Sequence, residues 1–232
     1  MVESATGALL GLLLGARHAL EPDHLAAVST LTVRADRCWH CAALGGLWGI
    51  GHTLALLCLG GGLILAERSM PPWLDRMIEL LVALVMITLG GSALRQALRS
   101  KADSFLPAGT DRPECIATQS TKSASPSYWL RLASRTLAVG FVHGLGGSGP
   151  LMALAAAGLH GVLPRILYLA LFGAGSVAGM AAMSGLIGWP SVHLRKQPIL
   201  GRRLSLIIAG SSLLNGLSWL LLALHTLWTG VT

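Results

Sequence analysis

The stretch RHALEPDHLAAV, residues 17 to 28, interrupts an apolar region with five ionisable side chains: Arg17, His18, Glu21, Asp23 and His24. Leu, Ala and Gly dominate the sequence on both sides of it. Each charge placed at the centre of a membrane helix costs on the order of 2.5–3.5 kcal/mol. Five such groups within so short a segment therefore indicate a function, not only a role in packing.

The composition of the chain is that of a membrane protein. Of 232 residues, 53% are hydrophobic and only 12% are charged, whereas soluble domains carry roughly 25% charged residues. The net charge of +7 does not indicate nucleic-acid binding, because the basic residues lie between apolar runs and not on one soluble basic face. We therefore expect a lipid bilayer, and no nucleic acid, among the partners.

Six apolar runs are long enough for a transmembrane helix, which needs about 20 residues. They lie near residues 5–33, 42–66, 74–98, 132–159, 163–188 and 203–229. Five tryptophans fall at the predicted ends, as in an aromatic belt: Trp39, Trp73, Trp129, Trp189 and Trp228. The sequence predicts an all-α integral membrane protein with about six transmembrane helices.

The distribution of Lys and Arg predicts the orientation of the chain. Thirteen of them lie in or beside the first, third and fifth connections, while the opposite side holds only Arg68, Arg76 and Arg165. Cytoplasmic loops carry the excess of basic residues. We expect the odd connections in the cytoplasm and both termini outside, in the inner (plasma) membrane of a bacterium.

The chain divides into two halves joined by a polar segment. Residues 99–131 are rich in Pro, Ser and Thr, which is typical of a flexible linker, and we expect them in the cytoplasm. Residues 1–98 and 132–232 then form two three-helix units.

The two halves resemble each other. GARHALEPDHL, starting at Gly15, aligns with GFVHGLGGSGP, starting at Gly140, and this pairs His18 with His143. LWGIGHTLA, residues 47–55, aligns with LFGAGSVAG, residues 171–179. The two offsets are 125 and 124 residues. Because each half has an odd number of spans, we expect two inverted three-helix repeats, an architecture of transporters whose substrate site lies on interrupted helices near the midplane.

A break in the first helix would bring its ionisable groups together. On a regular helix, His18 and His24 would lie about 120° apart around the axis. Pro22 has no N–H for the carbonyl of His18 and crowds the preceding turn, so we expect a kink or an unwound turn there. Irregular backbone at membrane depth is tolerated where it lines a cavity or packs on protein. We further expect Arg17 to pair with Glu21 or Asp23.

The residue types predict a site for a divalent transition metal. Imidazole suits nickel, zinc, copper and iron, and carboxylate suits harder ions. The candidate ligands are His18, Asp23, His24 and His52, with Glu21 and His143 as helpers. The absence of Cys near them disfavours a soft Cu(I) site.

RHALEPDHLAAV resembles the H-x4-D-H signature of the NicO family of nickel and cobalt transporters, and LWGIGHTLAL resembles the second signature of that family. Together they cover roughly residues 11 to 56. The resemblance implies an integral membrane permease for Ni(II) or Co(II), with metal-handling roles for His18, Asp23, His24 and His52. The ion would be the substrate; no cofactor and no enzymatic activity are implied.

The chain departs from the usual members of the family in several ways. It has about six spans instead of eight, and Glu21 stands where the first signature usually has Asp. FVHGLGGSGP and LFGAGSVAGM resemble the shorter, urease-accessory-like branch. No His-rich loop of the kind seen in related exporters is present, which favours uptake.

Two other functions are compatible with parts of the sequence. GGSG at 146–149 fits the G-x-S-G of rhomboid-type intramembrane proteases, with Ser148 and His225 as the catalytic pair. That hypothesis leaves the first cluster without a role. A membrane partner that holds metal for a maturation system without transporting it is the other alternative. Cys38, His40 and Cys41 could also handle metal, although ordinary reduced cysteines are favoured.

Overall fold

The computed structural model describes residues 2–32, 38–68, 70–103, 126–146, 159, 161–194 and 198–229, and every regular element in them is a helix. This confirms the predicted all-α class. The elements are α1 (Val2–His18), α2 (Pro22–Thr32), α3 (Cys38–Ala55), the π-helix η1 (Leu56–Gly60), α4 (Gly61–Leu65), α5 (Pro72–Asp103), α7 (Pro126–Leu145), α9 (Val162–Leu194) and α10 (Pro198–Thr229).

Four of the six predicted spans are confirmed as helices long and apolar enough to cross a membrane. They are Cys38–Leu65, which joins α3, η1 and α4, and Pro72–Leu98, Val162–Trp189 and Arg202–His225. A bilayer core needs about 20 apolar residues of helix. The chain is therefore an integral membrane protein in its described part.

The other two predicted spans differ from the expectation. The run at 5–33 is divided between α1 and α2, and neither helix is a candidate span by itself. The run at 132–159 contains α7, which ends at Leu145, while 147–158 lie outside the described residues. Within the described residues, four full spans are therefore present, together with shorter helices.

The break between α1 and α2 is where the sequence placed it, and it is one of the two expected forms, an unwound turn at residues 19–21. The N–H of Glu21 donates to the carbonyl of His18 (3.0 Å), and the N–H of Leu20 donates to that of Arg17 (2.9 Å). These short-range bonds end α1. Pro22 then begins α2, a position where its missing N–H costs nothing. Pro22 thus starts a new helix instead of kinking a continuous one.

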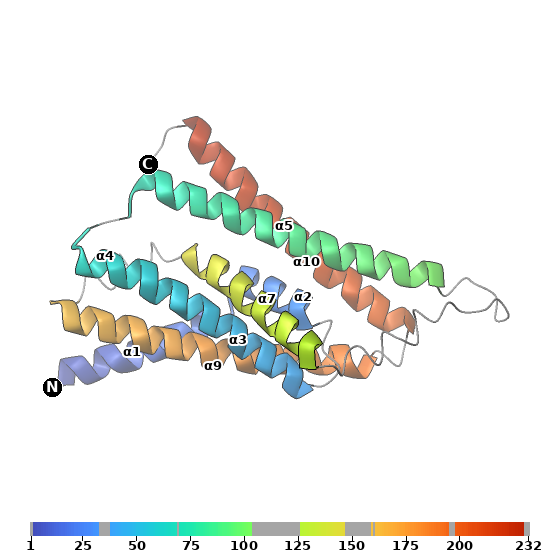
Figure 1. The fold of residues 1–232 in the computed structure, drawn as a ribbon, viewed down its shortest axis with the longest axis horizontal. Coiled ribbons are helices and arrows are strands. Elements are labelled where there is room, and N and C mark those ends of the chain that lie inside the picture. Colours follow the sequence, from blue (N-terminus) through green and yellow to red (C-terminus); the bar gives the residue numbers. More distant parts are fainter. Residues whose placement is uncertain are drawn as a thin grey trace.

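The helices form two groups with α2 between them (Figure 1). In the first group α9 packs against both α1 and α3, and α3 also packs against α7; in the second, α5 packs against α10. The short α2 contacts α3, α5, α9 and α10. Helices α1, α5 and α9 run in one direction, α3, α7 and α10 in the other, and both termini lie at the same end (Figure 1).

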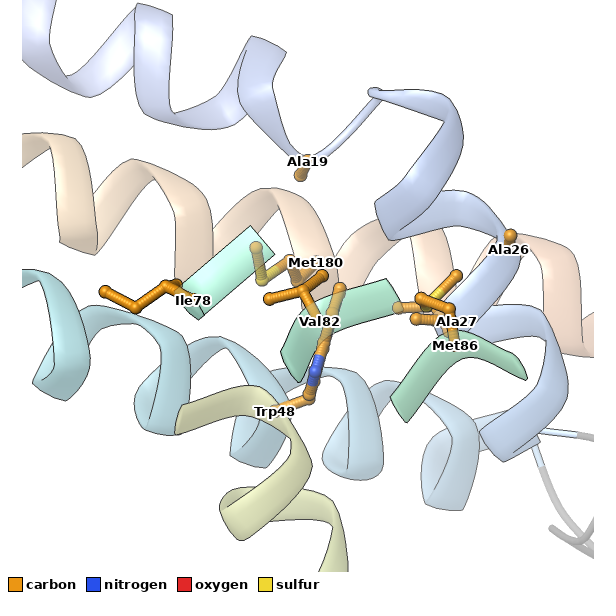
Figure 2. Close-up of a cluster of buried hydrophobic side chains, with 9 residues drawn as sticks. Ala19, Ala26, Ala27, Trp48, Ile78, Val82, Met86 and Met180 are labelled. Atoms are coloured by element: carbon orange, nitrogen blue, oxygen red, sulfur yellow. The ribbon is translucent and has the colours of Figure 1, made fainter. Parts of the chain in front are cut away.

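Small side chains allow α2 to be buried between its neighbours. Ala26 and Ala27 are 5% and 0% exposed. Around them lie Trp48 of α3, Met86 of α5 and Met180 of α9, all fully buried. Figure 2 shows these side chains meeting beside the α1–α2 break. The apolar core therefore fixes the position of the segment that carries the ionisable cluster.

Close approach of helix backbones depends on glycine, as is common in membrane bundles. A Cβ on Gly90 of α5 would lie 2.8 Å from Cγ and 2.9 Å from the backbone nitrogen of Leu213 in α10. A Cβ on the neighbouring Gly91 would meet no atom within 4 Å. The two adjacent glycines therefore differ sharply in their tolerance of a side chain.

We predict that Gly90→Ala lowers the stability of the protein, by about 1–3 kcal/mol for overpacking. Gly91→Ala is the matched control and should be neutral or stabilising, since Ala is favoured over Gly within a helix by roughly 0.5–1 kcal/mol. Thermal unfolding of the two variants in detergent measures the difference. Equal melting temperatures would contradict the packing of α5 on α10.

Candidate metal centre

Four imidazoles from four helices converge at the α1–α2 break. They are His18 at the end of α1, His24 in the first turn of α2, His52 in α3 and His143 near the end of α7. All are buried, with exposed fractions of 7%, 2%, 1% and 2%. The His24 ring centroid lies 4.2 Å from that of His18, 5.2 Å from that of His52 and 4.8 Å from that of His143.

The change of direction after His18 makes this convergence possible. On one continuous helix the side chains of His18 and His24 would diverge by about 120°. Because α1 ends and α2 starts again at Pro22, the two rings meet edge to face. The structure thus brings together the residues that the sequence singled out, from segments far apart in the chain.

Asp23 lies between two of the imidazoles. One carboxylate oxygen accepts a hydrogen bond from Nδ1 of His24 at 2.8 Å, and the other accepts one from Nε2 of His143 at 3.1 Å. Its side chain is only 14% exposed. The carboxylate therefore links α2 of the first half to α7 of the second.

His18 has a comparable arrangement. Its Nδ1 lies 2.9 Å from a carboxylate oxygen of Glu21, whose side chain is 53% exposed. Its Nε2 faces Nε2 of His52 at 3.3 Å. The expected pairing of Arg17 is wrong within the described residues: Glu21 and Asp23 pair with histidines, and Arg17 is exposed.

Several buried nitrogens in the cluster have no hydrogen-bond partner among the described residues. They are Nε2 of His24, Nδ1 of His52, Nδ1 of His143 and Nε1 of Trp48. Leaving a buried polar group unpaired costs about 1–3 kcal/mol. These atoms leave room in the cluster for hydrogen bonds or metal bonds to a bound species.

The donor atoms form two overlapping groups that could hold a metal ion. His18, His24 and His52 make up one, and Asp23, His24 and His143 the other; within each, the ligand atoms lie within 4.8 Å of one another. Imidazole nitrogens with one carboxylate suit a borderline divalent ion. His24 belongs to both groups.

Trp48 is a residue that the sequence reasoning missed. Its indole is fully buried, 5.3 Å from the rings of both His24 and His143. A signal was available, because Trp48 lies inside a predicted span while five other tryptophans lie at span ends. Of these, Trp39, Trp73, Trp189 and Trp228 are well exposed, as an aromatic belt requires.

The other candidate residues do not join this cluster. Cys41 is buried against Leu44 and Leu132, and the His40 ring lies 4.0 Å from those of Trp39 and Trp129, which fits packing. For the protease hypothesis, Ser148 lies outside the described residues. His225, near the end of α10, is exposed.

Comparison with known proteins places the chain in a family. It is 33% identical over 183 residues to the urease accessory protein UreH of Bacillus sp. (strain TB-90), which covers 78% of this chain and 75% of that protein. The chain belongs to the UreH family. This confirms the resemblance to the NicO family of nickel and cobalt transporters, of which UreH is a relative.

More distant relatives of this UreH-family protein occur in plants. Chloroplast proteins FOR GROWTH AND FERTILITY 1 and 2 of Arabidopsis thaliana are 29% and 28% identical over 203 and 200 residues. The matches cover 83% and 84% of this chain but only 52% and 50% of those proteins. No family model matches the chain, and no solved structure matches it.

We predict that the purified protein binds Ni(II) and that His24→Ala weakens this binding at least about tenfold, since even residues that only support a ligand contribute 10–100-fold. Equilibrium dialysis or calorimetry in detergent measures the affinity. His225→Ala serves as a control, because that histidine is exposed at the far end of α10. Equal affinities of the two variants would remove His24 from the site.

Proposed function

We propose that this UreH-family protein is a secondary permease for a divalent transition metal, Ni(II) or Co(II), and that it acts in uptake. The observation that carries the proposal is the buried group of four imidazoles and one carboxylate at a helix break. In transporters, interrupted helices near the midplane hold the substrate. An ion that sheds its water there would be stabilised by the imidazole nitrogens that lack a partner among the described residues.

The family favours nickel over cobalt. The Bacillus relative is named as a urease accessory protein, and it is related to the nickel and cobalt transporters. Imidazole-rich sites bind Ni(II) well. We therefore propose Ni(II) as the principal substrate and a supply of nickel to urease as the role.

Reciprocal contacts between the halves support the two inverted repeats that we propose. A Cβ on Gly51 of α3 would collide with the backbone carbonyl of Leu137 in α7. A Cβ on Gly175 of α9 would collide in the same way with that of Leu12 in α1. The two contacts are equivalent under the alignment of the halves. The offset of 124 residues relates Gly51 to Gly175, and the offset of 125 relates Leu12 to Leu137.

Aromatic contacts repeat in the same manner. The rings of His18 and Phe172 are 5.3 Å apart with planes at 49°. Those of His143 and Trp48 are also 5.3 Å apart at 49°. The same two offsets relate the pairs, because His18 corresponds to His143 and Trp48 corresponds to Phe172. Since α1 and α7, α3 and α9, and α5 and α10 run in opposite directions (Figure 1), we propose that 1–98 and 132–232 are inverted repeats joined by 99–131.

The orientation proposed from the basic residues agrees with the arrangement of the helices. The start of α1 and the end of α10 lie at one end of the bundle, and the end of α5 and the start of α7 lie at the other (Figure 1). We propose that the end with the termini faces outward across a bacterial inner membrane. Movement of the α5–α10 pair relative to the group formed by α1, α3, α7 and α9 would then expose the ion to each side in turn.

Reconstitution into liposomes tests transport directly. We predict that vesicles with the wild-type protein take up radioactive nickel, and that His18→Ala or His24→Ala reduces the rate by about tenfold or more. His225→Ala should transport normally. Normal uptake by correctly inserted His18→Ala and His24→Ala variants would end the permease proposal. Nickel binding without uptake by the wild type would favour a non-transporting delivery partner.

A membrane potential should drive accumulation. An inside-negative potential of 100 mV contributes about 2.3 kcal/mol per charge, so about 4.6 kcal/mol for a divalent ion. This corresponds to roughly a thousandfold accumulation or more. We predict that a valinomycin-induced potassium potential raises internal nickel in liposomes and that its collapse releases the ion. Uptake that ignores the potential would indicate electroneutral exchange.

A further inference from the structure

The π-helix η1 interrupts the span Cys38–Leu65 between α3 and α4. We propose that η1 and the glycines that follow it form a hinge, which opens and changes the angle between α3 and α4. Helix α4 precedes α5 in the chain. The hinge therefore lies in the connection between the group formed by α1, α3, α7 and α9 and the α5–α10 pair. Its part in transport rests on the proposed function.

The π-turn keeps one face of this span against α9. A Cβ on Gly45 would collide with Ser184 of α9, and Ile64 is buried in one cluster with Leu169 of α9. Gly45 and Ile64 are 19 residues apart, which on a regular helix would leave them about 100° apart around the axis. Because a π-turn takes in one residue more than an α-turn, the other 18 residues complete five turns and both positions face α9.

The backbone hydrogen bonds of η1 are weaker than those of a regular α-helix. The N–H of Gly61 is shared among three carbonyls, those of Leu56, Leu57 and Cys58. One donor divided among three acceptors cannot make a well-aligned bond with each of them. Single π-turns inside α-helices occur frequently at functional sites. We therefore expect the span to open more easily at this turn than in the regular helix on either side.

Neither packing nor turn geometry among the described residues explains the glycines after η1. Gly61 has a φ of −61°, and Gly62 is not among the described residues with a positive φ. A Cβ on either glycine would meet no atom within 4 Å, so close approach of a neighbour does not require them. What glycine adds at both positions is conformational freedom, which favours the opened state of a helix over the closed one.

The equivalent segment of the second half is a regular helix. The offset of 124 residues relates residues 56–62 to residues 180–186, which lie inside α9 without a π-turn. Ser184 stands there in place of Gly60, and its hydroxyl donates to the carbonyl of Met180 at 2.6 Å. The hinge therefore belongs to the first half alone, and the second half supplies a natural comparison for it.

Hydrogen exchange measured by mass spectrometry on the full-length protein in detergent tests the hinge. We expect the amides of residues 56–62 to exchange faster than those of residues 180–186, because the two segments differ in the turn. Gly61→Ala or Gly62→Ala should slow this exchange about two- to fivefold, since Ala is favoured over Gly within a helix. Gly91→Ala, at a glycine of α5 where a Cβ also meets no atom within 4 Å, is the matched control and should leave it unchanged.

Deletion of Cys58 separates a hinge from a packing spacer. Without this residue the span can continue as a regular α-helix with Gly45 and Ile64 still facing α9, because 18 residues then separate them. We expect the variant to bind nickel as the wild type does, to lose the rapid exchange of the turn and to transport nickel more slowly. Gly61→Ala combined with Gly62→Ala removes no residue and should slow opening about five- to thirtyfold, with the same effect on transport.

Two results would overturn the hinge. Exchange of residues 56–62 as slow as that of residues 180–186 would show that the turn does not open. A variant that loses the rapid exchange but transports nickel at the wild-type rate would reduce η1 to a spacer, and the double glycine variant decides this alone if the deletion does not insert. A wild-type protein that takes up no nickel would instead refute the proposed function, while the exchange comparison would still decide whether the turn opens.

Discussion

The bridge made by the Asp23 carboxylate is the interaction on which the centre of the molecule depends. A charge inside a membrane protein has to be matched by donors, because lipid supplies none. Asp23 receives one hydrogen bond from its neighbour His24 and one from His143, 120 residues away. It thereby fixes the ring of a candidate ligand and at the same time ties the first half of the chain to the second.

The packing around this bridge explains why the helix can break there. The backbone of residues 19–21 has left the helical ladder, which is tolerated at membrane depth only where protein or water surrounds it. Ala19 is 2% exposed and lies with Trp48 and Met180 in the main apolar cluster. Protein therefore covers the break on one side, while the half-exposed Glu21 marks the side that is open.

Much of this arrangement could be predicted from the sequence. The long apolar runs correctly predicted four membrane-spanning helices, because the length and hydropathy of a run can be read from neighbouring residues alone. Pro22 located the break, and the constant offset between the halves paired His18 with His143. The motifs also named the residues that the structure brings together.

What could not be predicted depends on distant contacts. The partner of Asp23 is His143, and no spacing rule connects α2 with α7. The expected pairing of Arg17 failed because nearby histidines engage both carboxylates. Trp48 was overlooked because its hydropathy fits an ordinary span, and only tertiary packing places it between two imidazoles. Run length also did not show that the run at 5–33 is divided between α1 and α2, since it does not register where a helix stops.

The crossed packing of the halves has a consequence for biogenesis. Helix α1 packs on α9, and α3 packs on both α7 and α9, so each half completes its contacts only with the other. Until α7 and α9 are synthesised, Asp23 lacks the hydrogen bond from His143, and α1 and α3 lack the helices on which they pack. The bonds of Asp23 with His24 and of Glu21 with His18 need only the first half, so the centre is completed in two stages.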